Sequence, residues 1–464
     1  MKFLVLDAGS SFLKAAVADS ESLALAQVCR SAAIPRLPHA DPAIYEIDAD
    51  QLVATARRLI APLVRDVPVA GLLICGQMGG LIFADECGRP QSPWISWQDQ
   101  RTRGTTWPQL TAQLGSQVTT VLGNEWKPGL TLPLLYHLRQ QGECPPGVAC
   151  GLPDFLVAAL TASRPQLERT SATGLLSVAT GQLADLLADI GVLPAECWPA
   201  VVDFSLVRGQ TTIAGRTIPV YGGTGDHQTA LVGAMLQHEE LSINVATGSQ
   251  MSMLVEQPEL PHRRGQLRPF FDQSWLATVT NIPAGRALSA VLKLLTELSP
   301  EPANDQQWEQ FLKAAESVSQ TDVRAGLGFF AGAVPMPGRL TGLTEETLSV
   351  AHVAHACLHS MAAQYGDLQS ELAAGPPQQL VFSGGVARKS ALLRRLICAQ
   401  LSASRVDPPE QGDERASQMA SPMPSRMASA EDTLLGLAIL GKVISGECES
   451  VRQAIDTARR QQRQ

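Results

Sequence analysis

The chain contains two similar strand–turn–strand units, and this duplication constrains its fold more than any other feature of the sequence. Apolar runs at residues 2–7 and 12–17 enclose one turn of glycine and serine, and runs at residues 241–246 and 251–255 enclose another. Two facing domains could hold one polyphosphate between such turns, because glycine allows a close approach and hydroxyl groups donate hydrogen bonds. Hairpins with Gly-Ser turns are also common in α/β proteins, so two unrelated hairpins are the alternative.

Helical and strand patterns alternate along the rest of the chain. Helical spacing of apolar positions predicts helices over residues 51–64, 388–401 and 431–444. Compact apolar runs predict buried strands over residues 69–75 and 379–383, and each run leads into a pair of glycines or a glycine-rich loop. This alternation predicts an α/β fold built in layers.

The bulk composition indicates a globular protein of more than one domain. A length of 464 residues exceeds what one hydrophobic core usually serves, so we expect two domains, residues 1–236 and 237–464. Hydrophobic residues make up 45% and charged residues 17%, which is typical of a folded enzyme. A formal net charge of -8 argues against a basic nucleic-acid surface, so no nucleic-acid partner is expected.

Cysteine spacing and local composition suggest where the protein works. The nine cysteines contain no CxxC pair, which predicts reduced thiols, many of them buried, in a cytoplasmic protein. The apolar start at residues 3–6 is too short for a signal sequence or a membrane span, so no membrane partner is expected. Residues 407–429 are rich in proline, serine and methionine, which predicts a surface loop.

Five short stretches combine glycine or tryptophan with acid, amide or hydroxyl groups: residues 7–11, 76–80, 94–101, 222–228 and 247–250. In the third stretch, two tryptophans lie close to an aspartate and an arginine. Tryptophan packs on the apolar face of a sugar ring, while aspartate, glutamine and arginine can bond its hydroxyls. A pair of tryptophans that only fills the core is the alternative.

The order and content of these stretches resemble the FGGY carbohydrate kinases of the actin-like ATPase superfamily. The matching segments, in family order, are DAGSSFLK, GQMGG, SWQDQR, GGTGDHQTALVGA, ATGSQ, FSGGVARKS and SAEDTLLGLAILG. They begin at residue 7 and end near residue 441. The resemblance implies an α/β protein with two actin-like (ribonuclease H-like) ATPase domains and a cleft between them, acting as a monomer or homodimer.

The resemblance also implies an activity, namely ATP-dependent phosphorylation of a small sugar with Mg²⁺. The segments SWQDQRT and NVATGSQMSML, with the spacing to FFAGAVPMPGRLTGLT, are similar to the pattern of the sedoheptulokinases in this family. That resemblance implies a ketose substrate and first of all sedoheptulose. Another ketose or polyol kinase, such as a xylulokinase, a sugar-independent actin-like ATPase and a non-catalytic sugar sensor are the alternatives. Gly79 stands where the family's GQMHG loop has a histidine, so the identity of the sugar stays open.

Family position implies a role for each matching residue. Asp226 would be the general base, although an aspartate that caps a helix beginning near Thr229 is the alternative from the residues alone. Asp7 would hold Mg²⁺ through water, with Asp226 as a second metal carboxylate; its alternative is a turn-initiating aspartate. The sugar site would be formed by Gln77, Met78, Gly79, Trp97, Asp99, Arg101, Asp226 and His227. His227 alone would be interpreted as a structural histidine.

The nucleotide would lie between glycine turns of the two domains. The residues implied to bind ATP are Gly9, Ser10, Ser11, Lys14, Thr247, Gly248, Ser249, Gly384, Gly385 and Lys389. Free backbone N–H groups at the helix after Gly384 and Gly385 would suit a phosphate or nucleotide edge. Lys14 has two interpretations, a phosphate-binding cation or a solvent-facing strand residue. Closure of the domains over the cleft would exclude water and limit wasteful ATP hydrolysis.

Overall fold

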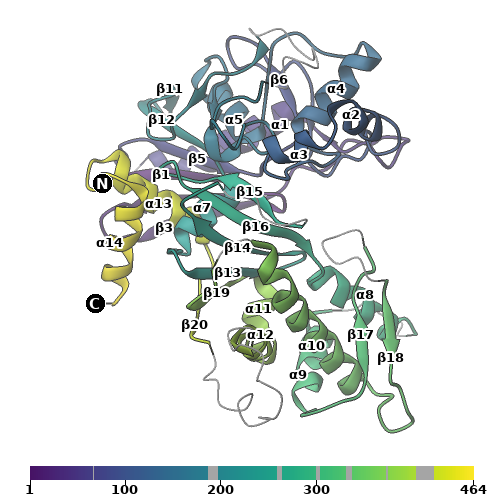
Figure 1. Ribbon diagram of the computed structural model, residues 1–464. Helices are drawn as coiled ribbons and strands as arrows, with labels where there is room; N and C mark the ends of the chain where they lie inside the picture. The colour runs from purple at the N-terminus through teal and green to yellow at the C-terminus, as the bar shows by residue number, and fades with distance from the viewer. Residues whose placement is uncertain are drawn as a thin grey trace.

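The computed structural model describes residues 1–65, 67–185, 197–258, 264–298, 304–330, 337–372, 375–403 and 423–463. Two six-stranded sheets, one from each half of the chain, organise it (Figure 1). The first sheet has the order β11-β12-β5-β1-β2-β3, and the second has the order β15-β16-β14-β13-β19-β20. Both are mixed sheets, as the alternating pattern predicts.

The two sheets repeat one topology. The first contains β1 (Lys2–Ala8), β2 (Phe12–Asp19), β3 (Leu25–Ala32), β5 (Leu72–Gly76), β11 (Gly209–Ile213) and β12 (Arg216–Gly225). The second contains β13 (Glu240–Val245), β14 (Ser249–Val255), β15 (Gln266–Pro269), β16 (Trp275–Ile282), β19 (Gln379–Ser383) and β20 (Ser425–Met427). In each, an antiparallel hairpin, β1–β2 or β13–β14, continues into two parallel strands, β5 and β12 or β19 and β20. The predicted duplication is therefore confirmed.

Helices cover both faces of the first sheet. The helices α1 (Ala49–Ile60) and α5 (Leu152–Thr161) enclose one core with the side chains of Leu4, Leu6 and Ile74. Side chains of opposite parity, such as Phe3, Val5 and Cys75, pack against α7 (Asp226–Gly233) and α13 (Asp432–Ile444). Leu276 and Val381 of the second sheet join that second core, so α7 and α13 lie between the two sheets (Figure 1).

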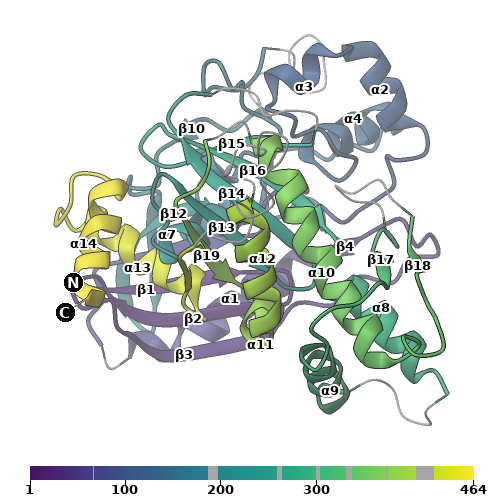
Figure 2. The same cartoon turned by 60° about the horizontal axis from the view of Figure 1, so that its bottom comes forward.

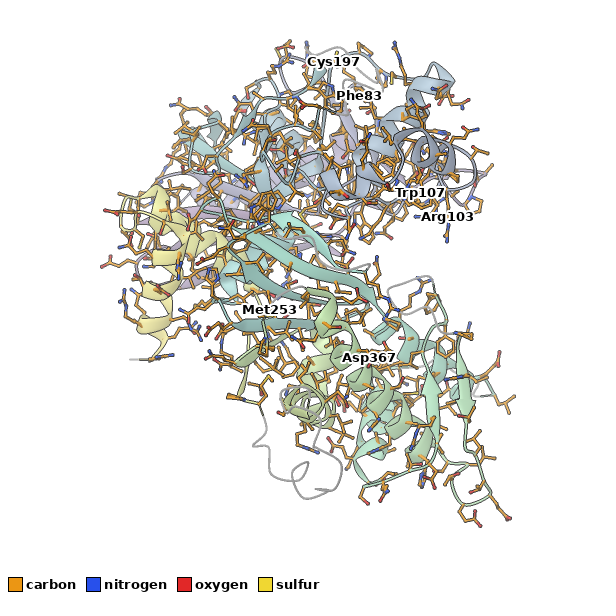
Figure 3. All side chains as sticks on the ribbon, viewed as in Figure 1. Phe83, Arg103, Trp107, Cys197, Met253 and Asp367 are labelled. Atoms are coloured by element: carbon orange, nitrogen blue, oxygen red, sulfur yellow. The ribbon has the colours of Figure 1, made fainter. Side chains whose placement is uncertain are left out.

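The second sheet has a core of its own on its other face. Met253 on β14 contributes to it, together with side chains of α8 (Gly285–Thr296), α10 (Val350–Gln369) and α12 (Ala391–Ala403) (Figure 3). The remaining helices are α2 (Thr106–Leu114), α3 (Gln117–Val121), α4 (Thr131–Gln141), α9 (Asp305–Glu316), α11 (Gly385–Lys389) and α14 (Val451–Arg463). The helices α2, α3 and α4 gather at the outer end of the first half, and α8 and α9 at the outer end of the second (Figure 2).

Short strand pairs complete the fold. They are β4 (Glu46–Ile47) with β7 (Trp94–Ile95), β6 (Ile82–Ala84) with β8 (Val148–Cys150), β9 (Leu167–Glu168) with β10 (Val201–Val202), and β17 (Arg324–Gly326) with β18 (Arg339–Thr341). Single turns of 3-10 helix occur at Pro62–Val64, Arg169–Ser171 and Ser370–Leu372. The first two small pairs connect the loops that carry the tryptophan motif and the glycine-rich loop after β5.

Two details differ from the sequence-based expectation. The helix predicted over residues 388–401 is broken, because Ser390 adopts an extended conformation between α11 and α12. Of the loop predicted over residues 407–429, residues 407–422 lie outside the described part. Ser425–Met427 form β20 and pair with β19, so the loop prediction is wrong for these residues. The reason is that the parallel strand β19 supplies backbone hydrogen bonds, which composition alone does not reveal.

The structure bears on two further expectations. All nine cysteines are free, and Cys75, Cys150, Cys357, Cys398 and Cys448 are buried, which confirms that many of the thiols are buried. Across the described ranges, none of the helices is both long enough and apolar enough to cross a membrane.

Candidate active site

The glycine-rich segment before Asp226 forms the end of β12 and the start of α7. Gly222 and Gly223 adopt φ values of 89° and 87°, and the pairing of β12 with β5 shifts between Gly222 and Thr224. A Cβ on Gly222 would lie 2.6 Å from the Ile74 carbonyl oxygen, so this position needs glycine for both conformation and space. Asp226 is the first residue of α7, and its Oδ1 accepts a hydrogen bond from the His227 backbone N–H at 2.8 Å.

That geometry excludes the helix-cap alternative for Asp226. The cap position of α7 belongs to Gly225. The helix begins at Asp226 and not near Thr229, where the cap alternative places its start. The carboxylate lies inside the first turn, where the helix dipole favours negative charge. Asp226 is therefore placed as a charged group at a helix start and not as its cap.

Three aspartates from three elements lie close enough to influence one another: Asp7 at the end of β1, Asp226, and Asp432 at the start of α13. Burial raises the pKa of each to about 6. The neighbouring charges contribute to this rise: Asp226 to the pKa of Asp7, Asp432 to the pKa of Asp226, and Asp7 to the pKa of Asp432. A hydrogen bond from the Thr433 hydroxyl to Asp7 Oδ2, 2.7 Å long, opposes this effect. Mutual repulsion of this kind favours a bound cation.

The aspartates suit a metal ion only when other ligands take part. Within the described ranges, no three His, Cys, Asp or Glu side chains are close enough to hold a metal ion by themselves. Mg²⁺ usually binds through one or two carboxylates, water and substrate phosphates, so the residues fit Mg²⁺ shared with a phosphate. Sequence reasoning missed Asp432, although it lies in the matched segment SAEDTLLGLAILG.

The first glycine–serine hairpin, predicted to bind phosphate, is the tight turn between β1 and β2. The Gly9 N–H donates to the Phe12 carbonyl at 3.1 Å, and a Cβ on Gly9 would crowd that same oxygen. Ser10 and Ser11 are exposed at its tip. Lys14 lies opposite Asp7 in the β1–β2 register, is half-buried and pairs with Glu431 at 3.1 Å. The charge of Lys14 lowers the pKa of Asp7. Lys14 therefore faces the aspartate as well as solvent.

The second hairpin, between β13 and β14, exposes only part of the predicted set. Thr247 and Gly248 are exposed, and a Cβ on Gly248 would meet nothing within 4 Å. Ser249 is 4% exposed, and its hydroxyl bonds the Asn244 carbonyl at 2.6 Å and the Tyr365 hydroxyl at 2.7 Å. The Ser249 side chain therefore points into the core and not toward the turn.

The turn after β19 has the glycines expected of a nucleotide edge. Gly384 has a φ of 87°, and a Cβ there would lie 2.3 Å from the Val245 carbonyl oxygen. A Cβ on Gly385 would meet nothing within 4 Å. Lys389 reaches α9 instead, where its Nζ lies 3.3 Å from Asp305 Oδ1 in a solvent-exposed pair. Such pairs contribute little, so nothing in this geometry directs Lys389 to the glycine turn.

The two tryptophans of the sugar motif have different environments. Trp94 is fully buried, as the core alternative predicts, whereas Trp97 is 41% exposed. The Trp97 indole N–H donates to Gln77 Oε1 at 3.0 Å, which joins the sugar motif to the loop after β5. Met78 in that loop reaches the turn before Asp226, because a Cβ on Gly225 would lie 2.5 Å from its sulfur.

Asp99 and Arg101 are already bonded to the protein. Asp99 is 0% exposed; its Oδ1 accepts from the Arg101 backbone N–H and Nε at 2.9 Å. Its Oδ2 accepts from the Tyr45 N–H at 2.7 Å and from Arg101 Nη2 at 2.8 Å. Arg101 Nη2 also donates to Glu46 at 2.7 Å. The pair braces the loop at Tyr45 and does not present an open carboxylate to a ligand.

His227 connects α7 to the second sheet. Arg268 Nη1 on β15 lies 3.1 Å from His227 Nδ1, and Ser252 Oγ on β14 lies 3.2 Å from its Nε2. A guanidinium only donates, so Nδ1 accepts and the imidazole proton is assigned to Nε2. Burial and the charge of Arg268 hold the pKa of His227 well below its usual value. The structural interpretation of His227 fits this environment.

Gly79 occupies a crowded position. Its φ is 74°, and a Cβ there would lie 3.1 Å from Leu130 Cδ2 and 3.2 Å from Trp97 Cβ. Leu130 and Trp97 therefore take the space into which a side chain at this position would leave the backbone. The surroundings of Gly79 thus leave little room for a histidine side chain at this position.

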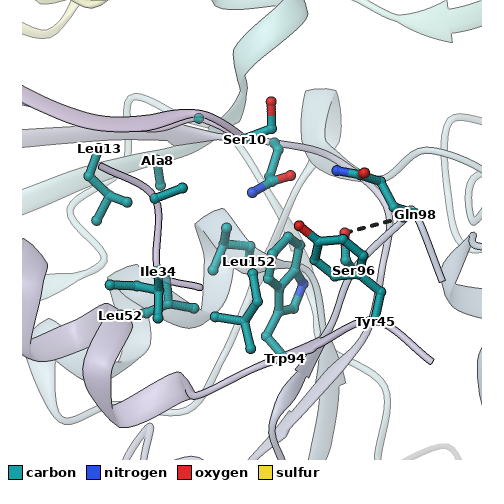
Figure 4. A pocket seen from close by; sticks show the side chains of 14 residues that line it. Ala8, Ser10, Leu13, Ile34, Tyr45, Leu52, Trp94, Ser96, Gln98 and Leu152 are labelled. Atoms are coloured by element: carbon teal, nitrogen blue, oxygen red, sulfur yellow. Dashed lines mark hydrogen bonds between the residues drawn. The ribbon is translucent and has the colours of Figure 1, made fainter. Parts of the chain in front are cut away.

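A cavity opens at the carboxyl ends of β1 and β5 (Figure 4). Polar groups line one side, from Ser10, Tyr45, Gln77, Ser96 and Gln98. Apolar side chains line the other, including Leu13, Ile34, Leu52 and Leu152. Three predicted site residues line it, namely Gly9, Ser10 and Gln77. Sequence reasoning missed Tyr45, Ser96 and Gln98, although the last two flank Trp97 in the motif.

The strand register places this cavity beside the turn that leads to Asp226. Gly76 of β5 pairs with Ala8 of β1 on one side and with Gly225 of β12 on the other. Adjacent strands are about 4.8 Å apart. Asp226 follows β12, which is the strand next to the one that Gln77 follows and two strands from the one that Gly9 follows. Ligands of open α/β sheets commonly bind at the carboxyl ends of strands.

Comparison with known proteins agrees with this arrangement. Residues 2–233 match the model of the N-terminal domain of the FGGY family of carbohydrate kinases. An apulose kinase from Pectobacterium atrosepticum is 25% identical over 410 residues, which cover 79% of this chain and 77% of that protein. A glycerol kinase from Koribacter versatilis is 26% identical over 429 residues, which cover 84% and 83%.

A solved structure shares the fold at lower identity. The gluconate kinase from Lactobacillus acidophilus superposes with a TM-score of 0.82 and 16% identity, covering 98% of this chain and 92% of that one. The overall fold of this chain is thus shared with that gluconate kinase.

Proposed function

The chain belongs to the FGGY family of carbohydrate kinases, with its two-domain actin-like fold, and from that premise we propose that it phosphorylates a ketose. Sedoheptulose is the first candidate, and xylulose or another ketose or polyol is the alternative. The observation that carries the proposal is the position of Asp226 at the start of α7, one strand from a cavity with a polar and an apolar side.

Asp226 would accept the proton of the attacking sugar hydroxyl. The hydroxyl oxygen bonds to the γ-phosphorus of ATP, the bond from that phosphorus to the β–γ bridging oxygen breaks, and ADP leaves. A pKa near 6 supports this role, because the carboxylate is then mostly ionised at neutral pH yet basic enough to take a proton. A positioned base contributes about 10²- to 10⁴-fold to a rate.

The phosphates would be held between the two hairpin turns. The exposed groups there are Ser10 and Ser11 on one side and Thr247 and Gly248 on the other. Asp7 and Asp226 would hold Mg²⁺, in part through water, and Asp432 adds a third carboxylate nearby. Mg²⁺ supplies charge neutralisation for the transferred phosphoryl group when it is bound. Gly384 and Gly385 would border the adenosine.

The cavity beside Gln77 would receive the end of the sugar that does not react. An extended ketose with its reacting hydroxyl at Asp226 can cross Gln77 and place its other end between Tyr45 and Ser96. The polar side offers partners for sugar hydroxyls, and the apolar side suits the C–H face of the chain. A ketose that reaches from Asp226 to this cavity would use both kinds of contact, so sedoheptulose is the first candidate.

ADP release measured over sedoheptulose, xylulose, ribulose, apulose and glycerol tests the proposal. We expect one ketose to give the highest kcat/KM, and Asp226→Asn to lower kcat about 10²- to 10⁴-fold on it. Equal background rates on every sugar would contradict sugar phosphorylation. ATP turnover that does not respond to any sugar would instead indicate an actin-like ATPase, and full sugar phosphorylation by Asp226→Asn would remove Asp226 as the base.

Tyr45→Phe tests the sugar cavity separately from the chemistry. Loss of one hydrogen bond costs about 0.5–1.5 kcal/mol, so we expect KM for the preferred ketose to rise roughly 2- to 12-fold. The same variant should leave KM for ATP and the rate on glycerol unchanged. An unchanged KM for the ketose would place the sugar elsewhere.

A further inference from the structure

Four buried polar residues surround the turn that leads to Asp226, and phosphoryl transfer as proposed above uses none of them. They are Asp154 on α5, Glu168 on β9, Thr170 in the following turn, and Arg208 before β11. Buried polar groups are costly unless they are bonded, so their partners indicate what they do.

The upstream half of the turn is held by Arg208 and Asp154. Arg208 Nη1 donates to the Gly222 carbonyl at 3.0 Å, and its Nη2 lies 3.5 Å from Asp154 Oδ1. A Cβ on Gly223 would lie 2.8 Å from Asp154 Oδ1, so that residue must be glycine for the carboxylate to fit. The two consecutive glycines with positive φ thus pack directly against the buried ion pair of Arg208 and Asp154.

The downstream half is held by Thr170. The Gly225 N–H donates to Thr170 Oγ1 at 3.0 Å, and the Thr170 hydroxyl donates in turn to Glu168 Oε2. The Thr170 backbone N–H donates to the same Glu168 oxygen at 2.7 Å. Asp154 Oδ1 accepts from the Glu168 N–H at 2.9 Å, which connects the two halves.

This contact adds an acceptor at the start of α7. The cap residue Gly225 has no side chain that could accept a hydrogen bond, and within the first turn Asp226 Oδ1 accepts from the His227 N–H. The helix is only 8 residues long, so its own hydrogen bonds hold its first residue weakly. The Thr170 hydroxyl fixes the start of α7 from a different segment of the chain.

We propose that Thr170 is a positioning residue for the catalytic base, holding the backbone of Gly225 so that the Asp226 carboxylate stays in its reactive place. The proposal rests on Asp226 being the base. Because the hydroxyl has one proton and gives it to Glu168, its lone pairs remain for the Gly225 N–H. Valine at this position keeps the shape of the side chain and removes that acceptor.

The test compares Thr170→Val with Thr170→Ser on the preferred sugar. We expect Thr170→Val to lower kcat by about 10- to 100-fold, because small displacements of a catalytic group cost rates of this order. KM for ATP and for the sugar should stay within about twofold, since neither ligand touches Thr170. Thr170→Ser should restore kcat, because serine supplies the same acceptor. Thermal unfolding establishes that each variant is folded.

Thr211→Val is the matched control. Thr211 is buried on β11 of the same sheet, and its hydroxyl has no hydrogen-bond partner among the described residues. Its loss should leave kcat unchanged. If Thr170→Val does not fold, Thr170→Ala removes the same hydroxyl with less bulk and serves in its place. A folded Thr170→Val enzyme with wild-type kcat, or a serine variant as slow as valine, would overturn the proposal.

A double variant separates this proposal from the base assignment. If Thr170 acts through Asp226, Thr170→Val should cause little further loss in an Asp226→Asn background, because residues that act as a unit are not additive. A further loss as large as in the wild-type background would overturn the role of Thr170 and leave Asp226 as the base. Full activity of Asp226→Asn alone would remove the base assignment instead.

Discussion

Glu168 has the largest pKa shift among the carboxyl groups around the turn that leads to Asp226, which are Asp154, Glu168 and Asp226 itself. Burial raises its pKa from 4.5 to about 8, although hydrogen bonds from Thr170 oppose the shift. The nearby charge of Asp154 adds to it. The protonated form is thus favoured in the folded chain at neutral pH, whereas the unfolded chain ionises.

This difference predicts a pH dependence of stability. A carboxyl whose folded pKa is raised contributes stability that is complete below about pH 4.5 and is lost as the pH rises through about 8. The free energy of unfolding of the wild type should therefore fall relative to that of Glu168→Gln across this window, by at most about 1.4 kcal/mol per pH unit. Thermal unfolding between pH 5 and pH 9 measures it.

The reference for that experiment is Glu86→Gln, which changes a mostly exposed side chain. Its unfolding curve should shift with pH in parallel with that of the wild type. A Glu168→Gln variant that also stays parallel to the wild type would show that Glu168 titrates normally.

At the scale of elements, the contact between α7 and α13 brings the aspartates together. A Cβ on Gly233 would lie 1.8 Å from the Asp432 carbonyl oxygen, and one on Gly436 would lie 1.9 Å from the Thr229 carbonyl oxygen. The two helix backbones therefore touch through glycine on both sides. This close approach places the start of α13 beside the end of α7, and the next turn of α13 beside the middle of α7.

Gly436→Ala should separate these helices. The added methyl group has no free space, and overpacking of this kind costs about 1–3 kcal/mol. We expect a lower midpoint of thermal unfolding and a reduced kcat, because Asp432 and Thr433 move away from Asp7. Gly104→Ala is the control, since a Cβ there would meet nothing within 4 Å. Equal stability of the two variants would contradict tight α7–α13 packing.

At the scale of the whole molecule, loops of the first half bind strands of the second. The Asn124 side-chain amide donates to the Gly265 carbonyl at 2.9 Å, and Lys127 Nζ donates to Thr280 Oγ1 at 3.0 Å. These bonds lie close to the contact of His227 with Ser252 and Arg268. A closing motion of the two halves would pivot near these contacts.

Closure predicts a change in dimensions on binding. Small-angle scattering should give a smaller radius of gyration with sugar and a nonhydrolysable ATP analogue than with either ligand alone, because both halves then contact ligand. Water would be excluded, and ATP hydrolysis without sugar should stay slow. Identical dimensions in all samples would contradict closure.

Local patterns were sufficient for most of the elements and for the turns of the site. Apolar runs bounded by glycine predicted β1, β2, β5, β13, β14 and β19, because the spacing of buried positions depends on each strand alone. The glycines before Asp226 predicted a special turn, and the positive φ values of Gly222 and Gly223 confirm that the backbone there needs glycine. The break at Ser390 and the pairing of β20 were not visible, because neighbouring strands and helices decide them.

The sequence by itself determined the duplicated strand–turn–strand units, the glycine turns and the segment that carries Asp226, since these follow from residues close together in the chain. Only the tertiary structure decided where the side chains point. It turned Ser249 into the core, bonded Asp99 to Arg101 and sent Lys389 to α9. It also added Asp432 and Thr170 to the surroundings of Asp226, and Tyr45 to the cavity beside Gln77. These outcomes depend on partners far away in sequence, which no local pattern encodes.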